Sequence, residues 1–260
     1  MAMTSEDLER LQYARELLEN PGLAAKLTNV IGMPFEKAFN YLPEKWSAAV
    51  QNITRKSLRY ALTAAVKTMD RKDRKSSQNT LHKILVAASG VIGGAFGLPA
   101  LALELPATTV IMFRSIADIA RSEGEDLAAM ETKLACLTVF ALGGSSGKDN
   151  SAESGYYALK ILLARQVSEA AKYIVERGIA EEAAPALVRL LATIASRFGV
   201  TVSQKAAVSA VPIIGAAGGA LINSIFMDHF QNMARGHFIM RSLEKQYGPD
   251  EVSRLYHRVS

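Results

Sequence analysis

The carboxylate of Glu104 lies in a run of residues that is otherwise apolar. The run LALELPATTVIMF, residues 101–113, carries no other charge. A buried carboxylate without a partner costs several kcal/mol of free energy, and its pKa rises. We therefore expect Glu104 to have a basic partner, a hydrogen-bond network or a water-filled cleft.

Further polar residues follow Glu104 at helical spacing. If a helix begins with Pro106 in its first turn, a rotation of about 100° per residue places Ser115 and Asp118 on one face. Arg114 stands four residues before Asp118, one helical turn away. The charges of this segment are thus clustered rather than scattered.

A second polar group lies in the segment MDHFQNMARGHFIMRSLEKQYG. Asp228 and Arg235 fall near one helical face, and His237 lies with apolar side chains on another. Like the Arg114 segment, it directly follows a Gly-rich apolar stretch. This similarity suggests a strongly diverged internal pseudo-repeat. One hypothesis places a common polar site between the two helices. Its candidate residues are Glu104, Arg114, Asp118, Asp228, His229, Arg235 and His237.

The same charges also fit a purely structural role. Arg114 with Asp118, and Asp228 with Arg235, would then form salt bridges that fix the register of neighbouring helices. We favour this interpretation, because structural ion pairs gather charged residues as functional sites do.

No metal or nucleophile motif accompanies these residues. His229 and His237 are eight residues apart, whereas two zinc ligands on one helix face are four apart. The run FALGGSSGKDN lacks the spacing of a phosphate loop and follows a predicted helix instead of a strand. Ser145 and Ser146 have no histidine near in sequence to act as a base. The residues favour a binding role over an enzyme, and we expect neither metal nor cofactor.

Nearly every periodic segment predicts a helix. Residues 153–178 are amphipathic and end on Gly178, a favourable C-cap, while Thr4 or Ser5 can cap a first helix. Residues 43–70 carry apolar positions at steps of three and four. These are Trp46, Val50, Ile53, Ser57, Tyr60 and Ala64. No alternating strand-like run is present, so the fold class is all-α, a single multi-helix bundle.

Two uncharged segments, residues 84–103 and 206–227, reach the length of a bilayer span. Pro99 and Pro212 predict helix breaks within them. Their glycines recur at spacings that let two helix backbones approach closely. These packing residues are Gly90, Gly93, Gly94, Gly97, Gly215, Gly218 and Gly219. We favour two helical hairpins packed centrally, buried or shallowly inserted, over helices that span the bilayer.

A basic segment precedes the first Gly-rich segment. Only Asp70 and Asp73 oppose its charge. Its run MDRKDRKSSQNTLHK has no aromatic residue and no recognition-helix motif, which argues against nucleic acid. An anionic membrane surface is the favoured partner, and a solvated linker is the alternative. The basic residues are Arg55, Lys56, Arg59, Lys67, Arg71, Lys72, Arg74, Lys75 and Lys83.

The chain has 260 residues, of which 49% are apolar, enough for one large core. We expect an N-terminal helical arm over residues 1–50, a helical domain over 51–248 and a helical tail over 249–260. The single cysteine, Cys136, fits a reducing compartment. The N-terminus has the charge pattern of a helix and not of a signal peptide.

Several motifs, in order, resemble the EcsC protein family of bacteria over residues 58–248. They are ELPATTVIMFRSIADIARSEGEDL, VFALGG, ESGYYALK and RFGVTVSQKAAVSAVPIIGAAGGALINSIFMDHFQNMARGHFIMRSLEKQYG. The motif residues of the family correspond here to Glu104, Arg114, Asp118, Gly143, Gly144, Gly155, Tyr156, Lys205, Pro212, Gly215, Gly218, Gly219, Asp228, His229, Arg235 and His237. The family takes its name from a protein encoded beside the two components of an ABC transporter. The resemblance therefore implies a bacterial, membrane-linked role without a mechanism.

Together these patterns predict a helical protein at the inner face of the bacterial cytoplasmic membrane. Its expected partner is anionic membrane lipid or a membrane protein such as an ABC transporter, and it is compatible with a homo-oligomer. The alternative is an enzyme or small-molecule binder with a polar site between the Arg114 and Asp228 helices.

Overall fold

The computed structural model is helical in the residues that it describes. It describes residues 3–19, 23–42, 46–68, 97–143, 152–178, 185–211 and 215–258. Within these ranges no strand occurs, which confirms the all-α prediction. The elements are α1 (Ser5–Glu19), α2 (Leu23–Ile31), α3 (Phe35–Ala38), the 3-10 helix η1 (Phe39–Tyr41), α4 (Trp46–Thr68), α6 (Gly97–Ser122), α7 (Met130–Leu142), α8 (Ala152–Arg177), α9 (Pro185–Ser209), α10 (Gly215–Tyr247) and α11 (Pro249–Tyr256).

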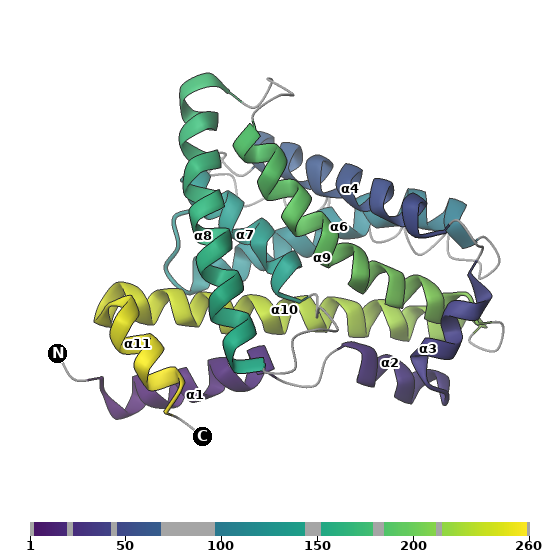
Figure 1. Ribbon diagram of the computed structural model, residues 1–260, viewed down its shortest axis with the longest axis horizontal. Helices are drawn as coiled ribbons and strands as arrows, with labels where there is room; N and C mark the ends of the chain where they lie inside the picture. The colour runs from purple at the N-terminus through teal and green to yellow at the C-terminus, as the bar shows by residue number, and fades with distance from the viewer. Residues whose placement is uncertain are drawn as a thin grey trace.

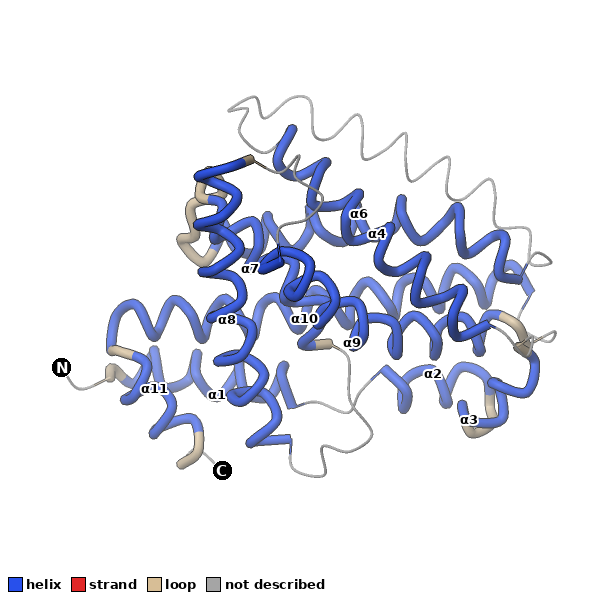
Figure 2. The backbone as a smooth tube through the Cα atoms, turned by 45° about the horizontal axis from the view of Figure 1, so that its top comes forward, coloured by secondary structure: helices blue, strands red, loops and turns tan. Residues whose placement is uncertain are grey.

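The 33-residue helix α10 runs across the molecule and has helices packed on both of its sides (Figure 1). Helices α1 and α11 pack beside one half of α10, and α2 packs beside the other (Figure 1). On the opposite side, α4 packs on α6 and α9, while α7 contacts α6, α8, α9 and α10. The tube in Figure 2 shows the same grouping, with both termini at the end that holds α1 and α11.

The core centres on α7. Every residue of this helix from 132 to 141 is buried, as expected for a helix that is apolar on all sides. Four phenylalanines join α7 to α9 and α10. Phe140 lies 4.8 Å from Phe198 and 5.3 Å from Phe230 between ring centroids, and Phe226 lies 5.2 Å from Phe230. These tilted and edge-on contacts bind the three central helices together.

Helix α6 begins earlier than the sequence predicts. It starts at Gly97, so Pro106 lies inside the helix and not in its first turn. Leu101 and Leu105, which precede the proline, are both buried. Because the proline removes one backbone hydrogen bond while the added turns bury apolar surface, packing outweighs the local preference.

Helix α4 is confirmed, but its buried face is rotated from the predicted stripe. Tyr60, expected on the apolar face, is 61% exposed, whereas Ala61 and Ala65 are buried. The buried face of α4 also includes the large residues Leu58 and Leu62, and Tyr60 lies on the outer face beside the exposed Arg59.

The predicted start of α1 and the predicted end of α8 agree with the structure. The backbone N–H of Asp7 donates to the hydroxyl oxygen of Thr4 at 3.2 Å, so Thr4 caps α1. Gly178 has a φ of 80° and its N–H donates to the carbonyl of Ile174 at 2.8 Å, which closes α8.

The Gly-rich segments are divided among helices. Gly97 is the first residue of α6, and Gly90, Gly93 and Gly94 lie outside the described residues, as do Arg71, Lys72, Arg74, Lys75 and Lys83. Residues 206–209 end α9, and Gly215, Gly218 and Gly219 fall in the first turns of α10. The break predicted near Pro212 agrees with α9 ending at Ser209 and α10 beginning at Gly215.

Among the described helices, α9 alone is long and apolar enough to cross a membrane by length and composition. Half of its most apolar window is buried inside the protein. Helix α9 packs on α4, α7 and α8. A buried core helix can have the same length and composition as a membrane span. These two properties therefore do not distinguish a core helix from a membrane span.

Candidate functional site

The predicted polar residues do not converge on one cleft. The side chain of Asp118 is 62% exposed and forms an ion pair with Arg121, not with Arg114. Arg235 is exposed and donates to the side-chain oxygen of Asn232 at 3.1 Å, and Asp228 is exposed as well. The two salt bridges expected along α6 and α10 are therefore absent among these residues.

Arg114 is half-buried at the side of α6. Its Nη1 atom is enclosed and has no hydrogen-bond partner within the described part of the chain. The neighbouring Ser115 hydroxyl accepts a hydrogen bond from Nε2 of Gln231 at 2.9 Å. This contact joins α6 to α10 without using the charges that the sequence had singled out.

Glu104 has the basic partner that its sequence context demands. Its carboxylate lies 2.7 Å from Nζ of Lys205 on α9, and the side chains are 16% and 4% exposed. The ammonium also lies 5.0 Å from the ring centroid of Phe226. The carboxylate and the aromatic face together stabilise a lysine that is nearly removed from water.

His229 closes the C-terminal end of α7. Its Nε2 lies 2.7 Å from the carbonyl oxygen of Gly143, and Nε of Arg197 donates to the carbonyl of Ala141 at 3.1 Å. Burial, opposed in part by the Gly143 hydrogen bond, lowers the pKa of His229, so the neutral ring donates to the carbonyl. Last-turn carbonyls of a helix have no partner within it, and these side chains supply one.

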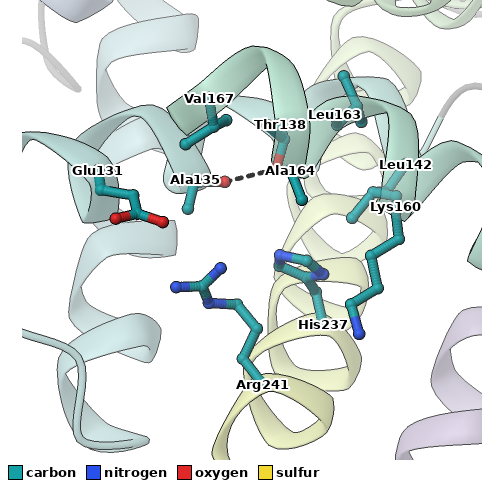
Figure 3. Close-up of a pocket in the computed structure, with 10 residues that line it drawn as sticks. All are labelled: Glu131, Ala135, Thr138, Leu142, Lys160, Leu163, Ala164, Val167, His237 and Arg241. Carbon is teal, nitrogen blue, oxygen red and sulfur yellow. Dashed lines mark hydrogen bonds between the residues drawn. The ribbon is translucent and has the colours of Figure 1, made fainter. Parts of the chain in front are cut away.

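His237, the other histidine of α10, faces a cavity. Its Nδ1 lies 3.2 Å from the hydroxyl of Tyr156 on α8. The cavity has a volume of about 40 Å³ and is enclosed by α7, α8 and α10 (Figure 3). Its lining residues are Glu131, Ala135, Thr138, Leu142, Lys160, Leu163, Ala164, Val167, His237 and Arg241.

Charged groups surround this cavity. Nε of Arg241 donates to Glu125 at 2.9 Å, Nζ of Lys245 lies 2.9 Å from the same carboxylate, and Lys160 forms an ion pair with Glu244. Burial alone would raise the pKa of Glu125, but hydrogen bonds from Arg241 and Lys245 hold it below the usual value. Burial also lowers the pKa of Lys160. The pKa of His237 is lowered by burial and by the nearby positive charges of Arg241 and Lys160.

A glycine turn places Glu125 beneath α10. Gly124 has a φ of 85°, its N–H donates to the carbonyl of Arg121, and the N–H of Glu125 donates to Ala120 at 3.0 Å. These two bonds are those of a Schellman motif, which ends α6 and reverses the chain. The carboxylate of Glu125 is thereby held under the last turns of α10.

The chemistry at the cavity is hydrogen-bond donation by N–H groups. Across the described ranges, no group of three His, Cys, Asp or Glu side chains could hold a metal ion. Burial raises the pKa of the Cys136 thiol strongly, so this cysteine stays protonated and is a poor nucleophile. Ser145 and Ser146 lie outside the described residues.

Comparison with known proteins decides the family. The model of the EcsC protein family matches residues 5–243. The chain belongs to the EcsC protein family. The searches of curated proteins and of solved structures found no match.

Six of the motif residues that suggested the EcsC family contact one another in three pairs. Glu104 meets Lys205, and His229 meets the carbonyl of Gly143. Tyr156 meets His237 in the same way. The EcsC match begins at residue 5, so it also includes the segment expected as an N-terminal arm. Helix α1 in that segment packs along α10.

Other polar residues of this EcsC protein were not singled out in the sequence. Arg241 stands one helical turn after His237, and Lys160 one turn after Tyr156, so helical spacing from two motif residues could have pointed to both. Glu125 follows Gly124 in a polar loop, and nothing in the local sequence indicates that its side chain is buried. Only the packing of α10 over that loop reveals its role.

Proposed function

We propose that this EcsC protein associates peripherally with the inner face of the cytoplasmic membrane by binding anionic lipid through α4. The observation that carries the proposal is the outer face of this helix. Arg55, Lys56, Arg59 and Lys67 are all exposed there. The 23 residues of α4 include no Asp or Glu, so no acid on the helix itself neutralises the face.

Tyr60 adds an amphipathic group to the same surface. It is 61% exposed between Arg59 and the buried Ala61. Tyrosine rings favour the headgroup region of a bilayer, where the ring is apolar and the hydroxyl is wet. Each Lys or Arg near an anionic surface contributes about 1 kcal/mol. The four cations and the tyrosine thus support reversible, salt-sensitive docking.

Vesicle flotation tests the proposal. The full-length protein is mixed with neutral phosphatidylcholine vesicles and with vesicles that also contain an anionic phospholipid. We expect flotation with the anionic vesicles alone, and release in salt of about 1 M, where charge screening acts within about 3 Å. Replacement of Arg55, Lys56 and Lys67 by Gln is expected to lower binding about a hundredfold.

A matched variant separates the α4 face from net charge. The substitutions Lys37→Gln, Lys172→Gln and Arg258→Gln remove the same charge from exposed positions elsewhere, and this variant should float like the wild type. Equal loss in both variants, or no flotation with either vesicle, would refute lipid binding by α4. Retention on native membranes without vesicle binding would point to a membrane protein such as a transporter instead.

A further inference from the structure

The cavity between α7, α8 and α10 has the form of a small pocket that opens on one side. Glu131 and Ala164 are exposed and mark its mouth, whereas Ala135, Thr138 and His237 are buried and form its floor. Figure 3 shows the side chains of Arg241, His237 and Lys160 grouped on one side of this space. The pocket is separate from the α4 face and does not rest on the lipid proposal.

Arg241 directs an unused donor toward the pocket. Its Nε and Nη2 atoms donate to Glu125 at 2.9 and 3.5 Å. The remaining Nη1 makes no hydrogen bond within the described part of the chain. Glu125 thus holds the guanidinium in place and leaves one edge of it for a ligand.

His237 supplies a second donor because of its bond to Tyr156. Burial raises the pKa of the Tyr156 phenol, so the hydroxyl keeps its proton. The hydroxyl lies 3.2 Å from Nδ1 of His237, and among the described residues it has no other acceptor. We assign the hydroxyl as the donor to Nδ1, the arrangement in which the ring proton lies on Nε2.

Lys160 supplies a third donor. Its ammonium pairs with Glu244 and lies 5.2 Å from the ring centroid of Tyr157. An ammonium has three N–H groups, and the ion pair with Glu244 occupies one of them. The aliphatic Leu163 and Val167 line the same pocket. Their low polarity strengthens any charge-assisted hydrogen bond made there.

We propose that this pocket binds a small oxyanion of carboxylate or phosphate type, held by Arg241 Nη1, His237 Nε2 and Lys160 Nζ. These three residues, from α8 and α10, line a space of about 40 Å³, room for about three waters or a small ion. That volume suits a free anion and not a lipid headgroup with its glycerol. Glu131 is the one acid that lines the pocket, and it stands at the exposed mouth.

Isothermal titration of the full-length protein with phosphate, bicarbonate, acetate and chloride tests this site. We expect at least one oxyanion to bind with a single-site isotherm, and chloride to bind more weakly. Lys160→Gln should weaken binding about tenfold, because it removes one charge-assisted hydrogen bond. Glu131→Gln should strengthen binding several-fold, because it removes the repelling charge at the mouth.

Lys172→Gln, on the exposed side of the same helix α8, is the matched control and should bind like the wild type. If Lys160→Gln fails to fold, the expected increase in oxyanion affinity of Glu131→Gln still tests the proposal. Absence of binding by every oxyanion would overturn the proposal, since the pocket would then hold water only. Equal affinity in the wild type, Lys160→Gln and Glu131→Gln would overturn it too.

Discussion

The partly buried carboxylate of Glu104 and the buried carboxylate of Glu125 lie near opposite ends of α6 and differ in their sequence context. Glu104 is conspicuous, because it is the single charge of an apolar run. Glu125 belongs to the polar segment RSEGEDL, where a charged residue gives no indication that it is buried. Yet the side chain of Glu125 is 3% exposed, against 16% for Glu104.

Their partners differ as well. Glu104 has one cation, Lys205, whereas Glu125 is held by Arg241 and Lys245. Hydropathy along the chain describes the covalent neighbours of a residue, but burial depends on its neighbours in space. The more deeply buried charge is the one that α10 covers after the chain has folded.

The largest effect is expected when the deeper carboxylate is removed. Glu125→Gln should lower the free energy of unfolding by about 3–5 kcal/mol, because it leaves the partly buried Arg241 without its anion. Urea denaturation at neutral pH measures this loss. Glu169→Gln is the matched control. Glu169 also has two arginine partners, Arg165 and Arg189, but all three are substantially exposed. Its loss should cost less than about 1 kcal/mol.

A smaller effect is expected at the other end of α6. Glu104→Gln should lower the free energy of unfolding by about 2–3 kcal/mol, because Lys205 remains buried without its anion. The same urea experiment measures it, with Asp118→Asn as an exposed control on the same helix. The paired change Glu104→Leu with Lys205→Met should recover most of the loss. If Glu104→Gln lowers the free energy of unfolding more than Glu125→Gln does, then the degree of burial does not determine which carboxylate contributes more to stability.

The pH dependence of stability sharpens the comparison further. Hydrogen bonds from Arg241 and Lys245 hold the pKa of Glu125 below its ordinary value of 4.5. The stability that this pair contributes is therefore complete above pH 4.5 and declines as the pH falls toward the lowered folded pKa. The decline reaches at most about 1.4 kcal/mol per pH unit.

Urea titrations from pH 6 downward, on the scale of ordinary carboxyl pKa values, compare the wild type with Glu125→Gln. The stability gap between the two proteins should narrow below pH 4.5. A gap that stays constant through this range would show that the carboxylate charge of Glu125 does not contribute.

Local chemistry made much of the fold predictable. The capping hydroxyl of Thr4, the left-handed Gly178 and the amphipathic period of α4 each act within a few residues, so the sequence carries their signal. The start of α6 was not predictable in this way. Pro106 looks like a first-turn residue, and only the burial of Leu101 and Leu105 extends the helix before it.

The candidate site was predictable in part. Desolvation required a partner for Glu104, and the structure provides Lys205. Which lysine would serve was not predictable, because the two residues are 101 positions apart in sequence. The pocket beside His237 needs three helices to meet, and no single segment contains its donors.

The sequence was sufficient to predict the all-α class, the start of α1, the end of α8, the basic residues of α4 and the EcsC resemblance. Each of these depends on residue type and short-range spacing, which do not change with the way the helices pack. The tertiary structure alone decided that Glu125 is buried, that Tyr60 is exposed and that Arg241, His237 and Lys160 share one pocket. Those outcomes depend on which helix faces meet, because distance in space sets both desolvation and charge pairing.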